Sequence, residues 1–357
     1  MFREIYSKQL AEYEKFWERK NTKRCTLSIA YKKNIGSPYR EPKSLEEKRL
    51  DSEYNYGLFQ NDMMRTGYMA EGLPKYFTNF GPGCLAACIG GEFELAPNTI
   101  WFDRVQKVTD WENPPKVVFD EQSEMWQHIV KRQERFARDP DICFTITDLG
   151  GILDVVASLR GTENLLYDLY DYPNEVIAFS KEVTAAWLQA FDLQVETVRR
   201  AGLPFNNWIN LPSEKPWYPL QCDFSYMISP AQFEKFVLDD LVTQANHMDR
   251  SIYHLDGVGE LPHVDMLLNI PNLTGIQWVP GAGQLRRRDP KWFDLYRRIQ
   301  DAKKNLVLEG DAISEYDLAG SERLIKSLDP TGLYISCHCS SEDKAKQMLE
   351  LVERWSE

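Results

Sequence analysis

Short apolar runs alternate with amphipathic helical segments through the second half of the chain, and this alternation constrains the fold more than any other feature. The clearest strand-like runs are residues 251–255, 275–279, 306–309 and 333–337. Each is followed by a segment with helical periodicity. The helical segment at 228–250 begins with Ser229 as a cap and Pro230 at the first helical position. Strands that alternate with helices of this length form βαβ units and a parallel sheet.

The first half of the chain is less regular but supplies further strand candidates. These are residues 25–31, 84–89, 142–147 and 206–209. Eight strand–helix units predict a (β/α)₈ TIM barrel, formed as a single domain over residues 1–357. Residues 1–24 form an N-terminal helical extension in this prediction, and an inserted segment at about 40–110 lies over the open end. An open doubly wound sheet is the alternative, but no glycine-rich phosphate-binding turn follows the first strand.

Charge and composition exclude several classes of partner. The formal net charge is −12, whereas nucleic acids and anionic membranes select basic surfaces. No apolar run approaches the 18 residues of a membrane span, and the charged N-terminus does not read as a signal peptide. Seven cysteines in such a chain do not indicate a disulfide framework. We therefore expect a cytoplasmic protein that acts on a small molecule, without a nucleic-acid or membrane partner.

Polar side chains gather at the carboxyl ends of the predicted strands, where barrel enzymes place their active sites. The carboxylates in these positions are Asp148, Asp223 and Glu309, and we predict that they are catalytic. The predicted substrate-binding residues are Asn207, Trp278, Gln277 and Tyr31. We expect these side chains to face one cavity, since the strand ends of a parallel barrel meet at one mouth.

The last apolar run ends in Cys337-His338-Cys339. Strand alternation places Cys337 and Cys339 on one face and His338 on the other, and it pairs His254 with Asp256 in the same way. Zinc accepts His nitrogen, Cys sulfur and carboxylate oxygen. His254 and Cys337, completed by Cys339 or Asp256, therefore form a candidate zinc site. The alternatives are small core cysteines and a hydrogen-bonded His-x-Asp pair.

Four segments resemble the uroporphyrinogen decarboxylase superfamily. They read DLGGILDVVASLRGTENLLYDLYDYPNE, ISPAQFEKFVLDDL, YHLDG and GLYISCHCSSEDKAKQMLELVE, and the resemblance extends from about residue 75 onward. It implies a (β/α)₈ barrel with a deep cleft at the carboxyl end. The superfamily contains the heme-pathway decarboxylase and zinc-dependent, corrinoid-linked methyltransferases.

The differences from each branch favour the methyltransferases. The arginine-rich R-Q-A-G-R-Y motif of the decarboxylase is replaced by AYKKNIGSPYR, and its Gly-His-Gly by Cys337-His338-Cys339. The methyltransferases bind zinc through a His-x-Cys pair and a late cysteine. The His-x-Cys pair resembles His254-x-Asp256 of this sequence, with Asp in place of Cys. The late cysteine resembles Cys337, or Cys339 after a register shift. The resemblance implies a zinc enzyme that moves a methyl group between a small substrate and a corrinoid on a separate protein. A metal-free decarboxylase and a non-catalytic small-molecule-binding barrel remain as alternatives.

Overall fold

A largely parallel sheet organises the molecule. The structure is a computed structural model and describes residues 2–139 and 142–356. Seven strands are joined in the order β2-β1-β9-β8-β7-β6-β5. The parallel strands are β1 (Thr26–Lys32), β5 (Trp217–Gln221), β6 (Arg250–Asp256), β7 (Gly275–Val279), β8 (Asn305–Leu308) and β9 (Leu333–Cys339), and β2 (Thr66–Ala70) pairs antiparallel with β1.

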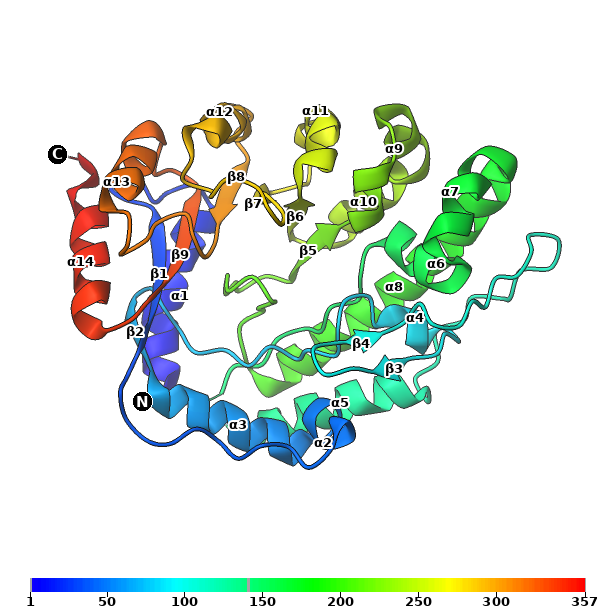
Figure 1. The fold of residues 1–357 in the computed structure, drawn as a ribbon, viewed down its shortest axis with the longest axis horizontal. Helices are drawn as coiled ribbons and strands as arrows, with labels where there is room; N and C mark the ends of the chain where they lie inside the picture. Colours follow the sequence, from blue (N-terminus) through cyan, green and yellow to red (C-terminus); the bar gives the residue numbers. More distant parts are fainter. Residues whose placement is uncertain (1, 140–141, 357) are drawn as a thin grey trace.

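Helices surround the sheet and the extended segments beside it. The first half supplies α1 (Phe2–Trp17), α2 (Leu45–Arg49), α3 (Ser52–Arg65), α4 (Leu85–Cys88), α5 (Glu124–Ala137), α6 (Ile152–Arg160), α7 (Thr162–Asp171) and α8 (Pro173–Ala201). The second half supplies α9 (Pro230–Phe236), α10 (Leu238–His247), α11 (Val264–Leu268), α12 (Phe293–Asp301), α13 (Leu318–Ser327) and α14 (Glu342–Glu353). In Figure 1 the helices α11 to α14 form an arc outside strands β6 to β9. No described helix is long and apolar enough to cross a membrane.

The predicted start of α9 is confirmed in detail. The Ser229 side chain accepts a hydrogen bond from the Gln232 backbone amide, and the Gln232 side-chain oxygen accepts one from the Ser229 backbone amide. Pro230 occupies the first turn, where its missing N–H has no intrahelical partner to lose. This capping box satisfies the free backbone amides at the start of α9. The helix begins soon after the 3₁₀ turn η1 (Asp223–Met227), which follows β5.

Helix α1 lies across the amino ends of the strands. Its Glu14 pairs with Arg250 at the start of β6, at 2.6 Å. The Asn305 amide at the start of β8 donates to the Phe16 carbonyl at 3.2 Å. The Trp17 ring packs against Trp217 of β5 with ring centroids 5.0 Å apart. These contacts cover the amino-terminal side of the sheet, so the polar carboxyl ends lie on the opposite side.

Five of the eight predicted strands are confirmed, namely 25–31, 251–255, 275–279, 306–309 and 333–337. The prediction of a strand at 84–89 is wrong, because this stretch contains the short helix α4. Its residues, Leu-Ala-Ala-Cys, are fully buried, and a short apolar run does not by itself distinguish a buried strand from a buried helix. Alanine then favours the helix.

The predicted strands at 142–147 and 206–209 are extended segments without a regular ladder. The Tyr76 amide donates to the Cys143 carbonyl at 2.8 Å, and the Thr145 amide donates to the Tyr76 carbonyl at 3.0 Å. The Ile146 amide donates to the Asn206 carbonyl at 3.2 Å. The regular sheet ends at β2 and β5, and these segments run beside one another through isolated bonds.

Strand β5 was not expected from the sequence. It contains Pro219, which cannot donate a ladder hydrogen bond and argues against a central strand. In the structure β5 pairs only with β6 and forms the last strand of the ladder. An edge position tolerates proline, which explains why this strand forms despite its composition.

Candidate metal centre and adjoining cavity

The parallel register places polar side chains from neighbouring strands side by side. Gln221 of β5 is aligned with His254 of β6, and His254 is aligned with Gln277 of β7. Residues aligned in this way project from the same face of the sheet. Glu309 follows β8 directly and reaches the same group through Gln277.

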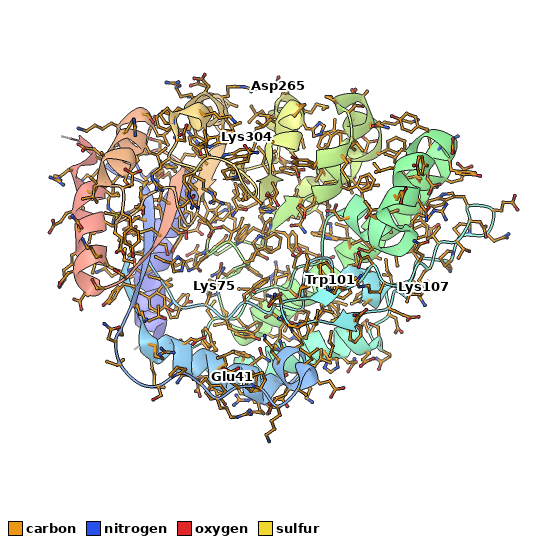
Figure 2. The ribbon with its side chains drawn as sticks, in the orientation of Figure 1. Glu41, Lys75, Trp101, Lys107, Asp265 and Lys304 are labelled. Atoms are coloured by element: carbon orange, nitrogen blue, oxygen red, sulfur yellow. The ribbon has the colours of Figure 1, made fainter. Side chains whose placement is uncertain are left out.

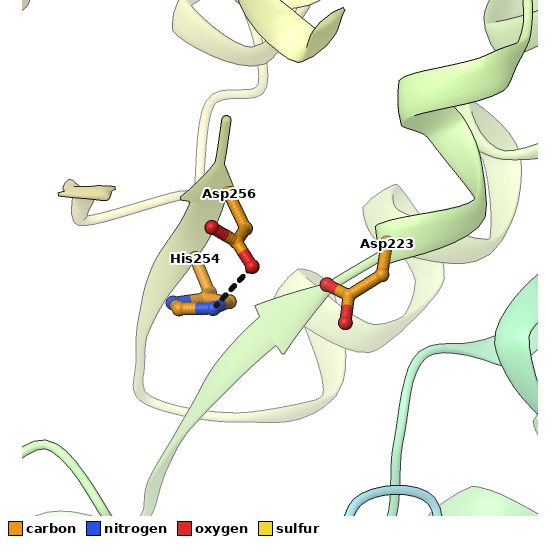
Figure 3. Close-up of side chains that lie close together, drawn as sticks. All are labelled: Asp223, His254 and Asp256. Carbon is orange, nitrogen blue, oxygen red and sulfur yellow. Dashed lines mark ion pairs between the residues drawn. The ribbon is translucent and has the colours of Figure 1, made fainter. Parts of the chain in front are cut away.

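Three side chains at the carboxyl ends of β5 and β6 form a group that can hold a metal ion. The ligand atoms of Asp223, His254 and Asp256 all lie within 4.8 Å of one another. His254 Nε2 lies 4.0 Å from Asp256 Oδ2. Figure 3 shows His254 and Asp256 on β6, with Asp223 facing them from the end of β5. Within the described ranges no other such group of histidine, cysteine or carboxylate ligands is found.

A chain of hydrogen bonds orients His254. Gln277 Nε2 donates to Glu309 Oε2 at 2.5 Å, so the Gln277 carbonyl oxygen faces His254 Nδ1, also at 2.5 Å. The carbonyl oxygen can only accept, so Nδ1 carries the proton. Nε2 is then left with a lone pair on the side of Asp256. This arrangement is typical of metal-binding histidines, whose other ring nitrogen is held by a polar partner.

The buried Lys75 lies near enough to Glu309 for each charge to shift the pKa of the other. Its ammonium donates to the Asn207 carbonyl at 2.6 Å and to the Trp208 carbonyl, and Figure 2 shows it near the centre of the molecule. Burial lowers the pKa of Lys75 to about 8, and the Glu309 carboxylate raises it in part. Burial raises the pKa of Glu309, which Lys75 partly offsets. The sequence offered no signal for Lys75, since it lies in the irregular first half.

Further carboxylates surround the group. Burial raises the pKa of Asp148 to about 6, although it accepts hydrogen bonds from the Gly150 amide at 2.9 Å and from Gln221 at 3.2 Å. Burial and the nearby Asp223 raise the pKa of Asp154 to about 7. Burial also raises the pKa of Glu260 to about 10. So many carboxylates near one another are costly unless some of them bind protons or a cation neutralises them, and the donors present fit a divalent metal.

The raised pKa values predict how stability depends on pH when no metal is bound. Asp148 and Asp154 bind a proton in the folded protein up to about pH 6–7, whereas in the unfolded chain they lose it near pH 4. The free energy of unfolding should therefore fall by about 4–6 kcal/mol as pH rises from about 4 to 7, at about 1.4 kcal/mol for each unit of pKa shift. Chemical denaturation of chelator-treated protein tests this. Asp154→Asn should flatten the curve and the exposed Asp249→Asn should not; a steadily rising stability would contradict the assignment.

The two predicted cysteine ligands lie on the outer face of β9, away from the candidate metal ligands. The Tyr334 hydroxyl donates to the Asn210 carbonyl at 2.9 Å, which places Tyr334, and by alternation Ser336 and His338, on the inner face. Cys337 and Cys339 therefore face outward, where β9 packs against α14. The predicted orientation of this strand is wrong, and Asp223 joins His254 and Asp256 where the cysteines were expected.

Tyr31 lies on the same outer face, and its predicted role in substrate binding is not supported by this position. It is aligned with Cys339 in the parallel register of β1 and β9. Its ring crosses Gly67 of β2, where any side chain would collide with it. Tyr31 also lies near Lys346 of α14. The ring is thus packed between a strand and a helix, away from the cleft.

Trp278 is a core residue and was wrongly expected in the cleft. It follows Gln277 on β7, so the two side chains point to opposite faces. Trp278 is fully buried and its ring lies 5.0 Å from that of Trp292.

Asn207, another predicted substrate-binding residue, is also fully buried. Its side-chain amide donates to the Trp217 carbonyl at 2.9 Å, and this bond holds the 205–217 segment together.

Of the predicted functional residues, the structure brings together Asp223, His254, Asp256, Gln277, Glu309 and Asp148. Sequence reasoning missed Asp154, whose carboxylate accepts hydrogen bonds from the backbone amides of Asp223 and Phe224 at 3.0 and 2.7 Å. It lies in the segment after 142–147 that carried the family resemblance, so a closer reading of that segment could have included it. A cavity of about 280 Å³ adjoins Asp154 and Asp223.

No protein-family model matches the sequence, and no curated protein matches it. Among solved structures, the chain is similar to a methyltransferase from Methanosarcina mazei, with a TM-score of 0.60 and 11% sequence identity. The similarity covers 91% of this chain and 95% of that chain. At this level of identity the two proteins are alike in fold, and the likeness extends over nearly the whole length of both.

Proposed function

We propose that this protein is a metal-dependent methyltransferase. Zinc is the first candidate metal, with His254, Asp223 and Asp256 as its ligands and a fourth position open to substrate. We also propose that the sheet and the extended segments beside it form a barrel whose carboxyl mouth is the active site. The methyl group would pass between a small substrate and the cobalt of a corrinoid carried by a separate protein.

The observation that carries the proposal is the orientation of His254. Its Nδ1 faces the Gln277 carbonyl oxygen, so the Nε2 lone pair is available beside Asp223 and Asp256. One imidazole nitrogen and two carboxylates are a donor set that zinc accepts, and three protein ligands leave a position open. When bound, the metal would supply a Lewis acid that lowers the pKa of a thiol or polarises the oxygen of a methyl ether.

The residues around the cluster would fix its geometry. Gln277 and Glu309 hold His254 in one tautomer, and Lys75 balances the charge of Glu309. Asp148 accepts a hydrogen bond from the Gln221 side-chain amide at the end of β5. This bond holds the end of β5 where Gln221 is aligned with His254. The fold that this chain shares with a methyltransferase adds support, although likeness at 11% identity concerns fold alone.

A decarboxylase that binds a polycarboxylated substrate is the weaker candidate. Such a substrate needs convergent basic groups, as in any anion site. The described side chains at this cleft are mostly carboxylates, among them Asp148, Asp154 and Asp223, and Lys75 is occupied by two carbonyls. A non-catalytic binding barrel would not require an oriented histidine between two carboxylates.

The test combines metal content with methyl transfer. Purified protein should hold about one zinc per chain, and it should catalyse the demethylation of free methylcobalamin by a small thiol, followed by absorbance. In that reaction the cobalt–carbon bond breaks with both electrons kept by cobalt, a sulfur–carbon bond forms, and the thiol proton is released. Chelation should abolish the rate and added zinc should restore it. A metal-loaded protein that is inactive with methylcobalamin and a broad panel of thiols and methyl ethers would refute methyl transfer.

A further inference from the structure

The cavity beside the metal cluster has its own chemical character. It has a volume of about 280 Å³ and shares Asp223 and Gln221 with the cleft. Residues 100–103, from β4 (Ile100–Trp101) and the turn after it, form one wall. The inserted part of the chain therefore reaches the carboxyl ends of the strands at this point. A ligand in the cavity would lie directly beside Asp223.

The charged residues in the cavity wall are all acidic. They are Asp103, Asp154 and Asp223, and no lysine, arginine or histidine is among the described residues that line it. The Asp154 oxygens are held in place by the Asp223 and Phe224 amides. Asp154 is thus a positioned carboxyl group with a pKa near 7, and a cation bound beside it would favour its ionised form. An anionic ligand would be repelled here, and a cationic ligand would be attracted.

Aromatic rings complete the wall. Trp101, Phe102 and Phe224 line the cavity, and the faces of such rings attract cations. Trp101 is 41% exposed and already has the Arg104 guanidinium 5.2 Å from its ring centroid. Arg104 is not among the residues that line the cavity, so its charge is not part of the cavity wall. In Figure 2 Trp101 lies in the middle part of the view, between Lys75 and Lys107.

We propose that this cavity binds an organic ammonium group, either a protonated or a methylated amine. Fixed carboxylates together with aromatic rings form the usual recognition site for such groups. This part of the proposal stands without the metal. The second part rests on the proposed function: the small-molecule substrate of the methyltransferase carries this ammonium group in the cavity and presents its reacting atom beyond Asp223, at the metal cluster. A sulfonate or carboxylate in the same cavity is excluded by its charge.

Calorimetric titration with choline tests the proposal. Its uncharged carbon isostere, 3,3-dimethylbutan-1-ol, is the matched ligand, and ethanesulfonate is the anionic comparison. We expect choline to bind at least about 10-fold more tightly than the isostere, with no binding of ethanesulfonate. Asp103→Asn and Trp101→Ala should each weaken choline binding about 5- to 10-fold. The exposed Asp110→Asn, outside the cavity, should not. Equal binding of choline and isostere, stronger binding of ethanesulfonate, or no binding of choline would overturn the proposal.

A second titration separates this proposal from the metal site. The His254→Ala variant should lose the metal but retain choline binding within about 3-fold, because His254 does not line the cavity. If choline binds while the wild-type protein contains no metal, the cavity proposal stands and the proposed function fails. If the metal is present but choline does not bind, the function stands and the ammonium assignment fails.

Discussion

Replacement of His254 by alanine should abolish the zinc binding that we propose for this protein. We expect the affinity for zinc to fall by about 100-fold or more, because His254 supplies the only nitrogen of the cluster and the remaining carboxylates would face one another without it. Elemental analysis and competition with a chromophoric chelator measure this. His247→Ala is the matched control, since His247 lies on the outside of the protein, at 2.8 Å from Asp192. Retention of about one zinc per chain by His254→Ala would place the metal elsewhere.

Two further variants sharpen this expectation. Gln277→Leu keeps the ligands but removes the group that orients His254, so zinc affinity should fall by about 10- to 100-fold. Cys337→Ser should retain the metal fully, because Cys337 faces α14 rather than the cluster. Loss of zinc from Cys337→Ser in a folded protein would reverse the assigned orientation of β9 and restore the cysteine ligands expected from the sequence.

Trp278→Ala should destabilise the protein by about 3–5 kcal/mol while leaving its metal content unchanged. The ring is fully buried against Trp292, and its Nε1 has no hydrogen-bond partner among the described residues, so the loss comes from packing and the cavity left behind. Urea denaturation gives the free energy of unfolding. Trp101→Ala, at a partly exposed tryptophan, should cost about 1 kcal/mol or less.

The opposite result for Trp278→Ala would have a clear meaning. If the variant were as stable as the wild type but failed to act on substrate, Trp278 would have to lie in the cleft. The alternation along β7 would then be reversed, and Gln277 could not orient His254. The stability of this variant therefore also tests the hydrogen-bond chain on which the metal site depends.

The sequence determined the second half of the fold because its signals are local. Runs such as 251–255 and 275–279 are apolar over a few residues and are followed by helices with their own caps, so strand and helix can be recognised without knowing their neighbours. The pairing of His254 with Asp256 also follows from alternation within one strand. Their position at the carboxyl end follows from the parallel sheet.

The tertiary structure decided which face of each strand points inward. Alternation in LYISCHC separates Cys337 from His338, but only the contact of Tyr334 with Asn210 shows that His338 is on the inner side. Trp278 was assigned to the wrong face of its strand for the same reason. Helices cover the outer face of the sheet, so both faces are buried and both accept large apolar side chains.

Contacts between distant segments likewise could not be predicted from the sequence. Asp223 reaches His254 because β5 forms next to β6, and β5 contains a proline that only an edge strand tolerates. Lys75 meets Glu309 across more than 200 positions of the chain. Such pairs depend on how the sheet curves and which loops it encloses. No pattern within a short window of sequence carries that information, because the interactions form only when the whole chain has folded.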